Sequence, residues 1–432
     1  MTLRLRSPKL LAAPGAPALL ATSIVARLPL AMFSIALLVH AQQLTGSFAV
    51  AGAVSAAYAL GSAASAPLLG GLVDRRGQTG VLVGGATVTA LALVATGLLP
   101  HDAPSLLLIA LAVAAGAASP PLDACVRTLL PVLAPDPDRL RTLFAFESAV
   151  LEVTFVAGPP LALGIGAIWS TGAALVLSGV TLLAGTLAFA TRPASRRWRP
   201  DPNSGAPKFR IGGSLRSPAI RTLILILAGT EVVFGATEVG VTAAAHMLGG
   251  TAAAGPLLGL WGAGSFVGGI VATRRGGGAT SPRGVTLLLA ALALTHGALI
   301  LATGSAVALG AMITLAGATI APTVASLYSL VDSAAPSGTE TEAFSWLLTA
   351  SLLGASLGAA VGGVLAQQAG AGAVFAFVAA AGGLTVLVAL LRSRSLLGEH
   401  RRGRDARVAL DVRDDHGHLI HVAPAPVLPG LE

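Results

Sequence analysis

Four ionisable side chains stand within long apolar stretches of this sequence, where a charge needs a partner. They are Arg27, Glu152, Glu231 and Glu238. Burial favours the protonated form of a carboxylate, whereas a neighbouring arginine favours the ionised form. A carboxylate whose arginine partner comes and goes would therefore bind and release a proton. These four residues are our candidates for a substrate and proton coupling site, with Glu152 and Glu231 preferred; the alternative is a static pair that Arg27 makes to fix helix packing.

The composition explains why these charges are unusual. Of the 432 residues, 54% are hydrophobic and only 11% are charged, and the mean hydropathy is +0.81. A soluble domain carries roughly 25% charged residues, so most of this chain is expected to lie in lipid. Apolar runs such as Val81–Leu99 and Leu106–Ala118 lack the alternation of barrel strands. The sequence therefore predicts an all-α membrane protein.

Twelve stretches reach or approach the roughly 20 residues that a helix needs to cross a bilayer. They lie near residues 18–42, 48–70, 80–99, 104–131, 142–167, 171–191, 218–247, 253–273, 284–303, 306–331, 342–367 and 371–391. The loops on one side are rich in arginine, including Arg75, Arg139 and Arg274, and those on the other side contain no Lys or Arg. By the positive-inside rule, both termini are expected in the cytoplasm, in a multi-pass protein of the cell (plasma) membrane.

The chain divides into two related halves of six spans. The expected parts are a cytoplasmic tail (1–17), a six-helix bundle (18–191), a cytoplasmic linker (192–217), a second six-helix bundle (218–391) and a cytoplasmic tail (392–432). Gly70–Gly77 closes span two, and the similar stretch Gly269–Gly276 closes span eight. Gly116–Pro121 ends span four, and the similar stretch Gly317–Pro322 lies in span ten. Parallel repeats of six spans are typical of transporters whose substrate site lies between the halves. Chance similarity of glycine- and alanine-rich sequence is the alternative.

The segment GGLVDRRGQT resembles the G-x-L-x-D-R-x-G-R-K/R signature of the major facilitator superfamily, at the loop where that family carries it. The matching residues are Gly70, Leu72, Asp74, Arg75 and Gly77, and the departures are Gln78 and Thr79. The resemblance covers roughly residues 18–391. It implies two six-helix bundles that rock around a central site, with Asp74 latching the cytoplasmic face when the carrier is open outward.

A second charged set lies at the cytoplasmic edge. Our candidates for a cytoplasmic gate are Gly70, Asp74, Arg75, Gly77, Arg127 and Glu147. Asp123 precedes Arg127 by one helical turn and is expected to hold it. In the second half, Thr273 replaces Asp74 and Tyr328 stands where Arg127 would map, so any latch is one-sided. The alternative is that the arginines only determine topology.

Prolines interrupt two spans. Pro121 in span four, and Gly158 and Pro159 in span five, are candidate helix hinges. The Gly158-Pro159 segment is similar to, though less complete than, the Gly-Pro motif of the family's antiporters. The alternative is that these prolines are not hinges and are tolerated because neighbouring helices bind the backbone groups that proline leaves without a hydrogen bond.

The function class follows from these features. The chain has no phosphate-binding G-x-x-x-x-G-K-[ST] motif, and its single cysteine, Cys125, excludes an internal disulfide. We expect no catalytic residues, no cofactor and no metal site. The expected function is proton-coupled export of a small organic molecule by a monomer, with the lipid bilayer, the substrate and protons as partners and no nucleic acid. Uptake of a small metabolite is the alternative within this class, and a non-transporting sensor or a membrane enzyme is the alternative outside it.

Overall fold

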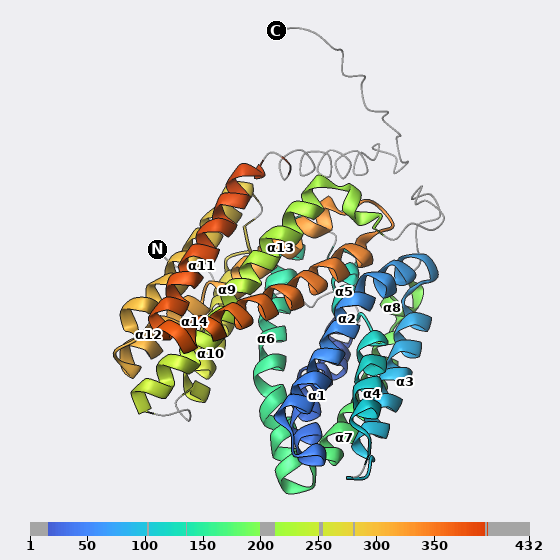
Figure 1. Cartoon of the computed structure of the whole chain (residues 1–432). Coiled ribbons are helices and arrows are strands. Elements are labelled where there is room, and N and C mark those ends of the chain that lie inside the picture. Colours follow the sequence, from blue (N-terminus) through green and yellow to red (C-terminus); the bar gives the residue numbers. More distant parts are fainter. Residues whose placement is uncertain are drawn as a thin grey trace, which may run out of the picture.

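The computed structural model describes residues 16–101, 103–134, 136–198, 212–249, 254–279, 281–393 and 395. Within these ranges the chain folds into helices, without any strand (Figure 1). The tail 1–17, the tail 392–432 and the linker stretch 199–211 lie wholly or largely outside the described residues. The boundaries expected for these parts stay predictions.

The N-terminal half contains α1 to α7. They are α1 (Ala16–Thr45), α2 (Phe48–Arg76), α3 (Gln78–Gly97), α4 (Ser105–Ala117), α5 (Leu122–Leu133), α6 (Pro137–Ile168) and α7 (Thr171–Ala190), followed by the short α8 (Pro193–Arg197). The hydroxyls of Ser47 and Ser170 cap α2 and α7 by accepting backbone N–H groups. Gly77, with φ of 86°, ends α2 and turns the chain directly into α3.

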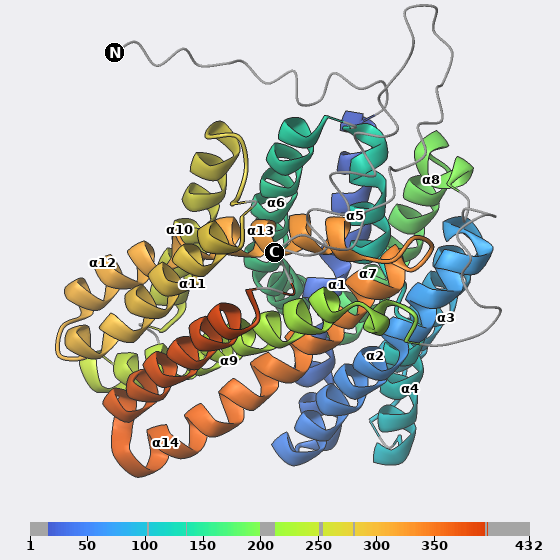
Figure 2. The same ribbon diagram turned by 90° about the horizontal axis from the view of Figure 1, so that it is seen from above.

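The C-terminal half contains α9 to α14. The elements are η2 (Ser214–Arg216), α9 (Pro218–Gly249), α10 (Ala254–Arg274), α11 (Pro282–Gly297), η4 (Ala298–Ala302), α12 (Ala306–Gly317), α13 (Ile320–Ala334) and α14 (Glu340–Leu391). The hydroxyls of Ser281 and Ser305 cap α11 and α12. Gly370, with φ of 76°, breaks α14 into two helical arms, and the chain turns back on itself between them (Figure 2).

Ten helices of the described chain are long and apolar enough to cross a membrane. This number takes α4 with α5, and α12 with α13, as one span each, and it takes α14 as a single helix despite its turn. It leaves out α6, some of whose side chains lie outside the described residues and in which the shorter stretch Ala157–Ile168 is apolar. The all-α membrane fold is confirmed, and the number of twelve spans stays a prediction.

The two halves break their fourth spans at equivalent places. The break lies between α4 and α5 in one half and between α12 and α13 in the other. Just before each break a glycine lets two helices touch: a Cβ on Gly116 would lie 2.9 Å from the carbonyl carbon of Tyr58, and one on Gly317 would lie 3.1 Å from that of Trp261. The repeated segments of the sequence therefore make the same helix contact in both halves.

The halves lie side by side, with α2, α5 and α6 of the first half facing α10, α13 and α14 of the second (Figure 1). We call the end where α2 and α10 finish and α6 and α14 begin the basic end. It carries Arg75, Arg76, Arg139, Arg141, Arg274 and Arg275. The other end, where α1 and α6 finish, is called the opposite end.

Candidate functional site

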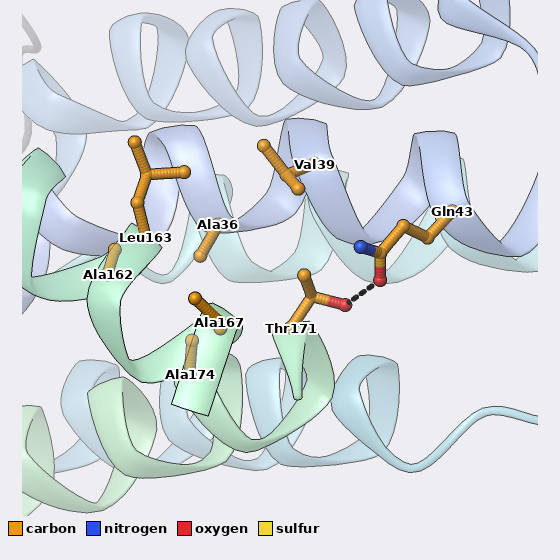
Figure 3. Close-up of a pocket in the computed structure, with 9 residues that line it drawn as sticks. Ala36, Val39, Gln43, Ala162, Leu163, Ala167, Thr171 and Ala174 are labelled. Carbon is orange, nitrogen blue, oxygen red and sulfur yellow. Dashed lines mark hydrogen bonds between the residues drawn. The ribbon is translucent and has the colours of Figure 1, made fainter. Parts of the chain in front are cut away.

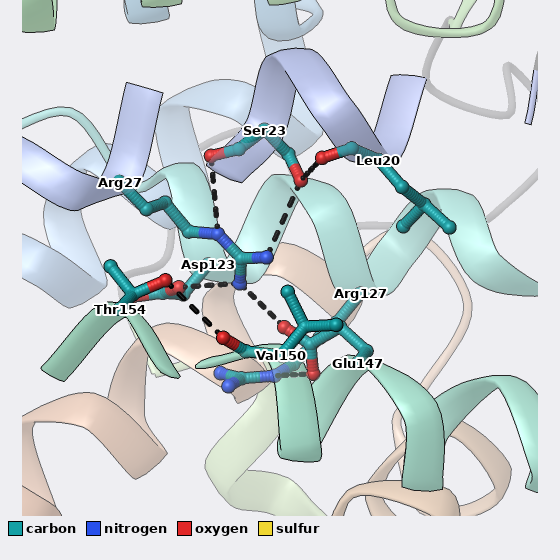
Figure 4. A network of polar contacts seen from close by, with 8 residues as sticks. All are labelled: Leu20, Ser23, Arg27, Asp123, Arg127, Glu147, Val150 and Thr154. Atoms are coloured by element: carbon teal, nitrogen blue, oxygen red, sulfur yellow. Dashed lines mark hydrogen bonds and ion pairs between the residues drawn. The ribbon is translucent and has the colours of Figure 1, made fainter. Parts of the chain in front are cut away.

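Arg27 of α1 lies at the centre of a buried charge network (Figure 4). Its Nη1 donates to Asp123 of α5 at 3.0 Å and to Glu147 of α6 at 2.5 Å. Its Nε and Nη2 donate to the carbonyl oxygen and the hydroxyl of Ser23, one turn earlier on α1. One guanidinium thus joins α1 to the consecutive helices α5 and α6, which are distant from it in the sequence.

Arg127 of α5 extends this network to the other half. Its Nε lies 3.6 Å from Oε2 of Glu147, which is an ion-pair distance but too long for a hydrogen bond. Its guanidinium carbon stands 3.7 Å from the centre of the Tyr328 ring on α13. Two arginines and two carboxylates balance in charge, as burial in a low-dielectric site requires.

Asp123 is the most exposed member of the network. Its side chain is 19% exposed, whereas those of Arg27, Arg127 and Glu147 are 2%, 4% and 0% exposed. Asp123 lies in the first turn of α5, directly after the break at Pro121. The break therefore leaves one carboxylate of the network partly exposed.

The sequence suggested that the coupling candidates and the gate candidates form two separate sets. In the structure, members of both sets belong to one network. Arg27 binds Glu147, which we had placed in the gate, and Asp123 binds Arg27 instead of holding Arg127. The physical reason is that α5 starts anew after the break, so the direction of Asp123 does not follow from a continuous span. Depth along the chain indicated that Arg27 needed a carboxylate, but not which one.

The other three coupling candidates lie on α6 and α9. Glu152 belongs to α6, and its side chain is outside the described residues. Glu231 on α9 is partly buried, and its Cβ would lie 2.9 Å from a Cβ placed on Gly354 of α14. Glu238, further along α9, is exposed.

Asp74 connects the halves at the basic end. Its Oδ1 accepts the backbone N–H of Thr341 at 3.0 Å, and its Oδ2 accepts that of Glu342 at 2.7 Å. Asp74 is thus the cap for the first turn of α14, although it belongs to α2 of the other half. A carboxylate at a helix N-terminus satisfies free N–H groups and opposes the positive end of the helix dipole.

Two glycines of the same loop motif serve this contact. A Cβ on Gly70 would lie 2.8 Å from the carbonyl oxygen of Thr341, so only glycine lets α2 approach α14 so closely. Gly77 provides the positive φ that ends α2 three residues after Asp74. Arg75, the remaining candidate of the motif, is exposed at this end.

Glu342 is a functional candidate that the sequence did not single out. It is 3% exposed, and its Oε1 accepts hydrogen bonds from the backbone N–H of Gly212 at 2.7 Å, from the Trp346 indole at 3.2 Å and from the Ser214 hydroxyl at 3.3 Å. Gly212 and Ser214 belong to the linker between the halves. Further along, the Thr349 hydroxyl donates to the carbonyl oxygen of Ala63 on α2 at 2.7 Å, so the basic end is closed over several turns.

The three hinge candidates occupy different positions. Pro121 is the N-cap residue of α5, at the break. Gly158 and Pro159 lie inside α6, which continues through both of them. A Cβ on Gly158 would lie 2.6 Å from that of Ala31, so Gly158 allows α6 to pack closely on α1. A hinge role for these residues stays a prediction.

The opposite end holds a second polar cluster and a cavity of about 210 Å³. The His40 ring contacts the Thr171 hydroxyl at 2.9 Å and the Thr96 carbonyl oxygen at 3.1 Å, and Thr171 donates to Oε1 of Gln43 at 2.7 Å. Gln43 and Thr171 form the polar part of the cavity wall (Figure 3). The remaining lining residues are Ala36, Val39, Ala162, Leu163, Gly166, Ala167 and Ala174.

Two helical halves, a buried charge network and a loop motif that caps a helix of the other half are features of helical membrane transporters. The sequence matches the Major Facilitator Superfamily over residues 19–340, and the chain belongs to this superfamily. The resemblance drawn from the loop motif is thereby confirmed. By sequence, no curated protein matches the chain.

Solved structures with this fold are distant relatives. The human organic anion transporter MFSD10 (TETRAN) has a TM-score of 0.69 at 16% identity, over 89% of this chain and 100% of that chain. A bacterial homologue of the iron transporter ferroportin, in an outward-facing state, has a TM-score of 0.69 at 18% identity, over 89% and 99%. In the described part of this chain, no three His, Cys, Asp or Glu side chains come together as metal ligands would.

The family match, the helices long enough to cross a membrane and the shared fold together show that the protein is a multi-pass membrane transporter.

Proposed function

We propose that this protein exports a small organic molecule across the plasma membrane in exchange for protons, working by alternating access. The observation that carries the coupling is the network of Arg27, Asp123, Glu147 and Arg127, a set of buried charges in the part of the fold where the halves meet. Ionisable groups at membrane depth are costly, by about 2.5–3.5 kcal/mol for a single charge on insertion scales, and usually serve function.

The chemistry of the coupling step is an exchange of Arg27 between carboxylates. Arg27 Nη1 binds Asp123 and Glu147 at once, so a proton on either carboxylate weakens one of its two charged bonds. Asp123 is the entry point in this proposal, because it is the most exposed member of the network. The ionised carboxylate is stabilised by the arginine, and the protonated one is stabilised once that arginine moves away.

Alternating access is supported by the closed contacts between α2 and α14. They include the Asp74 cap and the bond of Thr349 to Ala63. We place the basic end in the cytoplasm, because its loops carry the arginines. In that orientation the present conformation is closed to the cytoplasm.

Glu152, Glu231 and Glu238 enter the proposal as secondary coupling carboxylates. Glu231 is preferred among them, because it lies on α9, the counterpart of α1 in the second half, and packs beside Gly354 of α14. The direction of transport rests on the Gly158-Pro159 segment and on the acidic network. The substrates named for the two structural relatives are not carried over, because only the fold is shared.

The test is transport by the purified protein in proteoliposomes, with a lipophilic cation dye as the first probe and the hits of a ligand-stabilisation screen as further probes. The variants are Glu147→Gln, Asp123→Asn and Glu231→Gln, and the matched control is Asp136→Asn, whose side chain is 52% exposed. We expect uptake driven by an imposed pH gradient in the wild type and the control. Glu147→Gln should lose the dependence on the gradient while still exchanging labelled for unlabelled substrate. Unchanged gradient-driven transport in all three variants would exclude these carboxylates from coupling.

A further inference from the structure

Arg127 belongs to two sites at the same time. Its guanidinium faces Glu147 of its own half at 3.6 Å and lies over the Tyr328 ring of the other half at 3.7 Å. All three residues are buried, at 4%, 1% and 7% exposure of the whole residue. The stack on Tyr328 is thus shielded from water, where cation–π contacts are strongest.

The position of this pair follows from the repeat. Tyr328 occupies the place in the second half that Arg127 occupies in the first. Two equivalent positions of a parallel repeat meet only if both lie near the axis that relates the halves. The pair therefore lies where a rocking motion of the halves must separate it.

The ion pair within the first half is incomplete. Nε of Arg127 and Oε2 of Glu147 are both buried and have no hydrogen-bond partner. A small shift of Arg127 toward Glu147 would shorten the 3.6 Å separation to hydrogen-bond length. What holds Arg127 back is its stack on Tyr328, which is itself supported by the edge of Phe344 on α14.

We propose that Tyr328 positions Arg127 and thereby determines on which side of the membrane Glu147 gives up its proton. While the basic end is closed, Arg127 stacks on Tyr328 and leaves Oε2 of Glu147 free to take a proton. When the basic end opens, Tyr328 withdraws with its half, and Arg127 pairs with Glu147 and displaces that proton to the side that has opened. The proposal rests on the proposed coupling at Arg27 and Glu147.

The charged and titratable groups around Glu147 come from several helices. Arg27 comes from α1, Asp123 and Arg127 from α5, and Tyr328 from α13. Glu231 of α9 is near enough to Tyr328 to act on it electrostatically. From α14 the nearest ring is that of Phe344, which also packs on Phe144 of α6. Of the two arginines in this set, Arg127 is the one with a described contact to the second half, at Tyr328.

The experiment measures opening of the basic end as a function of pH, independently of any substrate. The reporter is Ser345→Cys in a Cys125→Ser background, because Ser345 is 1% exposed at the closed contact of α2 with α14. The labelling rate is the rate of modification by a hydrophilic maleimide in nanodiscs between pH 5 and 9, divided at each pH by the rate for the same cysteine in denatured protein, because maleimides react with the thiolate. It is measured for the wild-type gate, Glu147→Gln, Tyr328→Leu, Tyr328→Phe and the packing control Phe344→Leu. Each variant is first required to be monodisperse.

We expect faster labelling at high pH in the wild type, because ionised Glu147 favours the open state through Arg127. Tyr328→Leu should raise the labelling rate about tenfold and remove its pH dependence, because Arg127 then pairs with Glu147 in both states. Tyr328→Phe keeps a ring under the guanidinium and should restore the wild-type profile. Phe344→Leu removes a similar volume but should keep the pH dependence.

Two results would overturn the proposal. The first is that the labelling rate of Tyr328→Leu depends on pH as strongly as that of the wild type. The second is that the labelling rate of Phe344→Leu loses its pH dependence to the same extent as that of Tyr328→Leu. Failure of the proposed function has a different signature. In that case Glu147→Gln and the wild type give the same pH profile and the same gradient-driven transport. If the pH profile of Glu147→Gln differs from that of the wild type and the profile of Tyr328→Leu does not, the coupling role of Glu147 is supported and the role of Tyr328 is excluded.

Discussion

Oδ2 of Asp74 lies 2.7 Å from the backbone nitrogen of Glu342, so the loop motif of one half caps a helix of the other. The side chain of that same Glu342 holds the linker at Gly212. Loop motif, helix start and linker therefore meet at a single turn of α14. Any motion that opens the basic end has to break these contacts together.

Asp74→Asn should favour the open basic end. Asparagine keeps one acceptor but loses the charge that opposes the helix dipole and one of the two accepted bonds. The cost to the closed state is about 1–2 kcal/mol, or roughly 5- to 30-fold in population. Labelling of Ser345→Cys measures this shift, and Asp136→Asn at the same end is the control. Equal labelling of both variants would contradict the cap.

Gly70→Ala and Gly71→Ala form a matched pair of neighbouring substitutions. A Cβ on Gly70 would press on the carbonyl oxygen of Thr341 at 2.8 Å, whereas the nearest atom to a Cβ on Gly71 is Oε2 of Glu342 at 3.8 Å. Gly70→Ala should therefore hold the basic end open and slow turnover at least tenfold, and Gly71→Ala should be close to wild type. Transport and Ser345→Cys labelling both report the difference. A tolerated Gly70→Ala would mean that the contact is looser in the membrane.

Glu147→Gln should destabilise the protein more than Asp123→Asn. Either change leaves two arginines facing one carboxylate, but Glu147 is fully buried and makes the shorter bond, whereas Asp123 is 19% exposed. Breaking a buried pair costs about 3–5 kcal/mol, and water offsets part of this cost at Asp123. Thermal unfolding in detergent should place Glu147→Gln lowest. The reverse order would show that Asp123 carries the pairing of Arg27.

Glu342→Gln should loosen the linker without changing the Asp74 cap. The cap uses the backbone N–H of Glu342, whereas the linker is bound by its side chain. Loss of the charge weakens the bonds to Gly212, Ser214 and Trp346 by about 1–3 kcal/mol in total. Hydrogen exchange of the segment around Gly212 should become faster, and exchange at the start of α14 should change less. Trp346→Phe, which removes one donor only, is the milder comparison.

Much of the fold could be predicted from the sequence, because lipid imposes simple rules. Few charges and long apolar runs require helices, and the GGLVDRRGQT segment led to the correct superfamily. The internal repeat also predicted that Gly116 and Gly317 occupy equivalent places. The division into twelve spans cannot be read from the number of helices alone, since the chain turns inside α14 at Gly370 and the fourth span of each half is broken into two helices.

The candidate site was predicted in part. Arg27, Asp74, Arg127 and Glu147 were all singled out by residue type and depth. The structure pairs Arg27 with Asp123 and Glu147, which the sequence had grouped with the cytoplasmic edge. Glu342 was missed, since an acidic residue in the first turn of a helix is common and carries no signal of a linker contact.

The sequence by itself determined that this chain lies in a membrane as helices, that it belongs to a transporter superfamily and that its buried charges need partners. Only the tertiary structure decided which partners they have. Position along a span gives the depth of a residue in the bilayer, but not the direction in which its side chain points around the helix axis. That direction depends on the break before α5 and on the close approach of helices at Gly70 and Gly158, which together bring Arg27 to Glu147 and Arg127 to Tyr328.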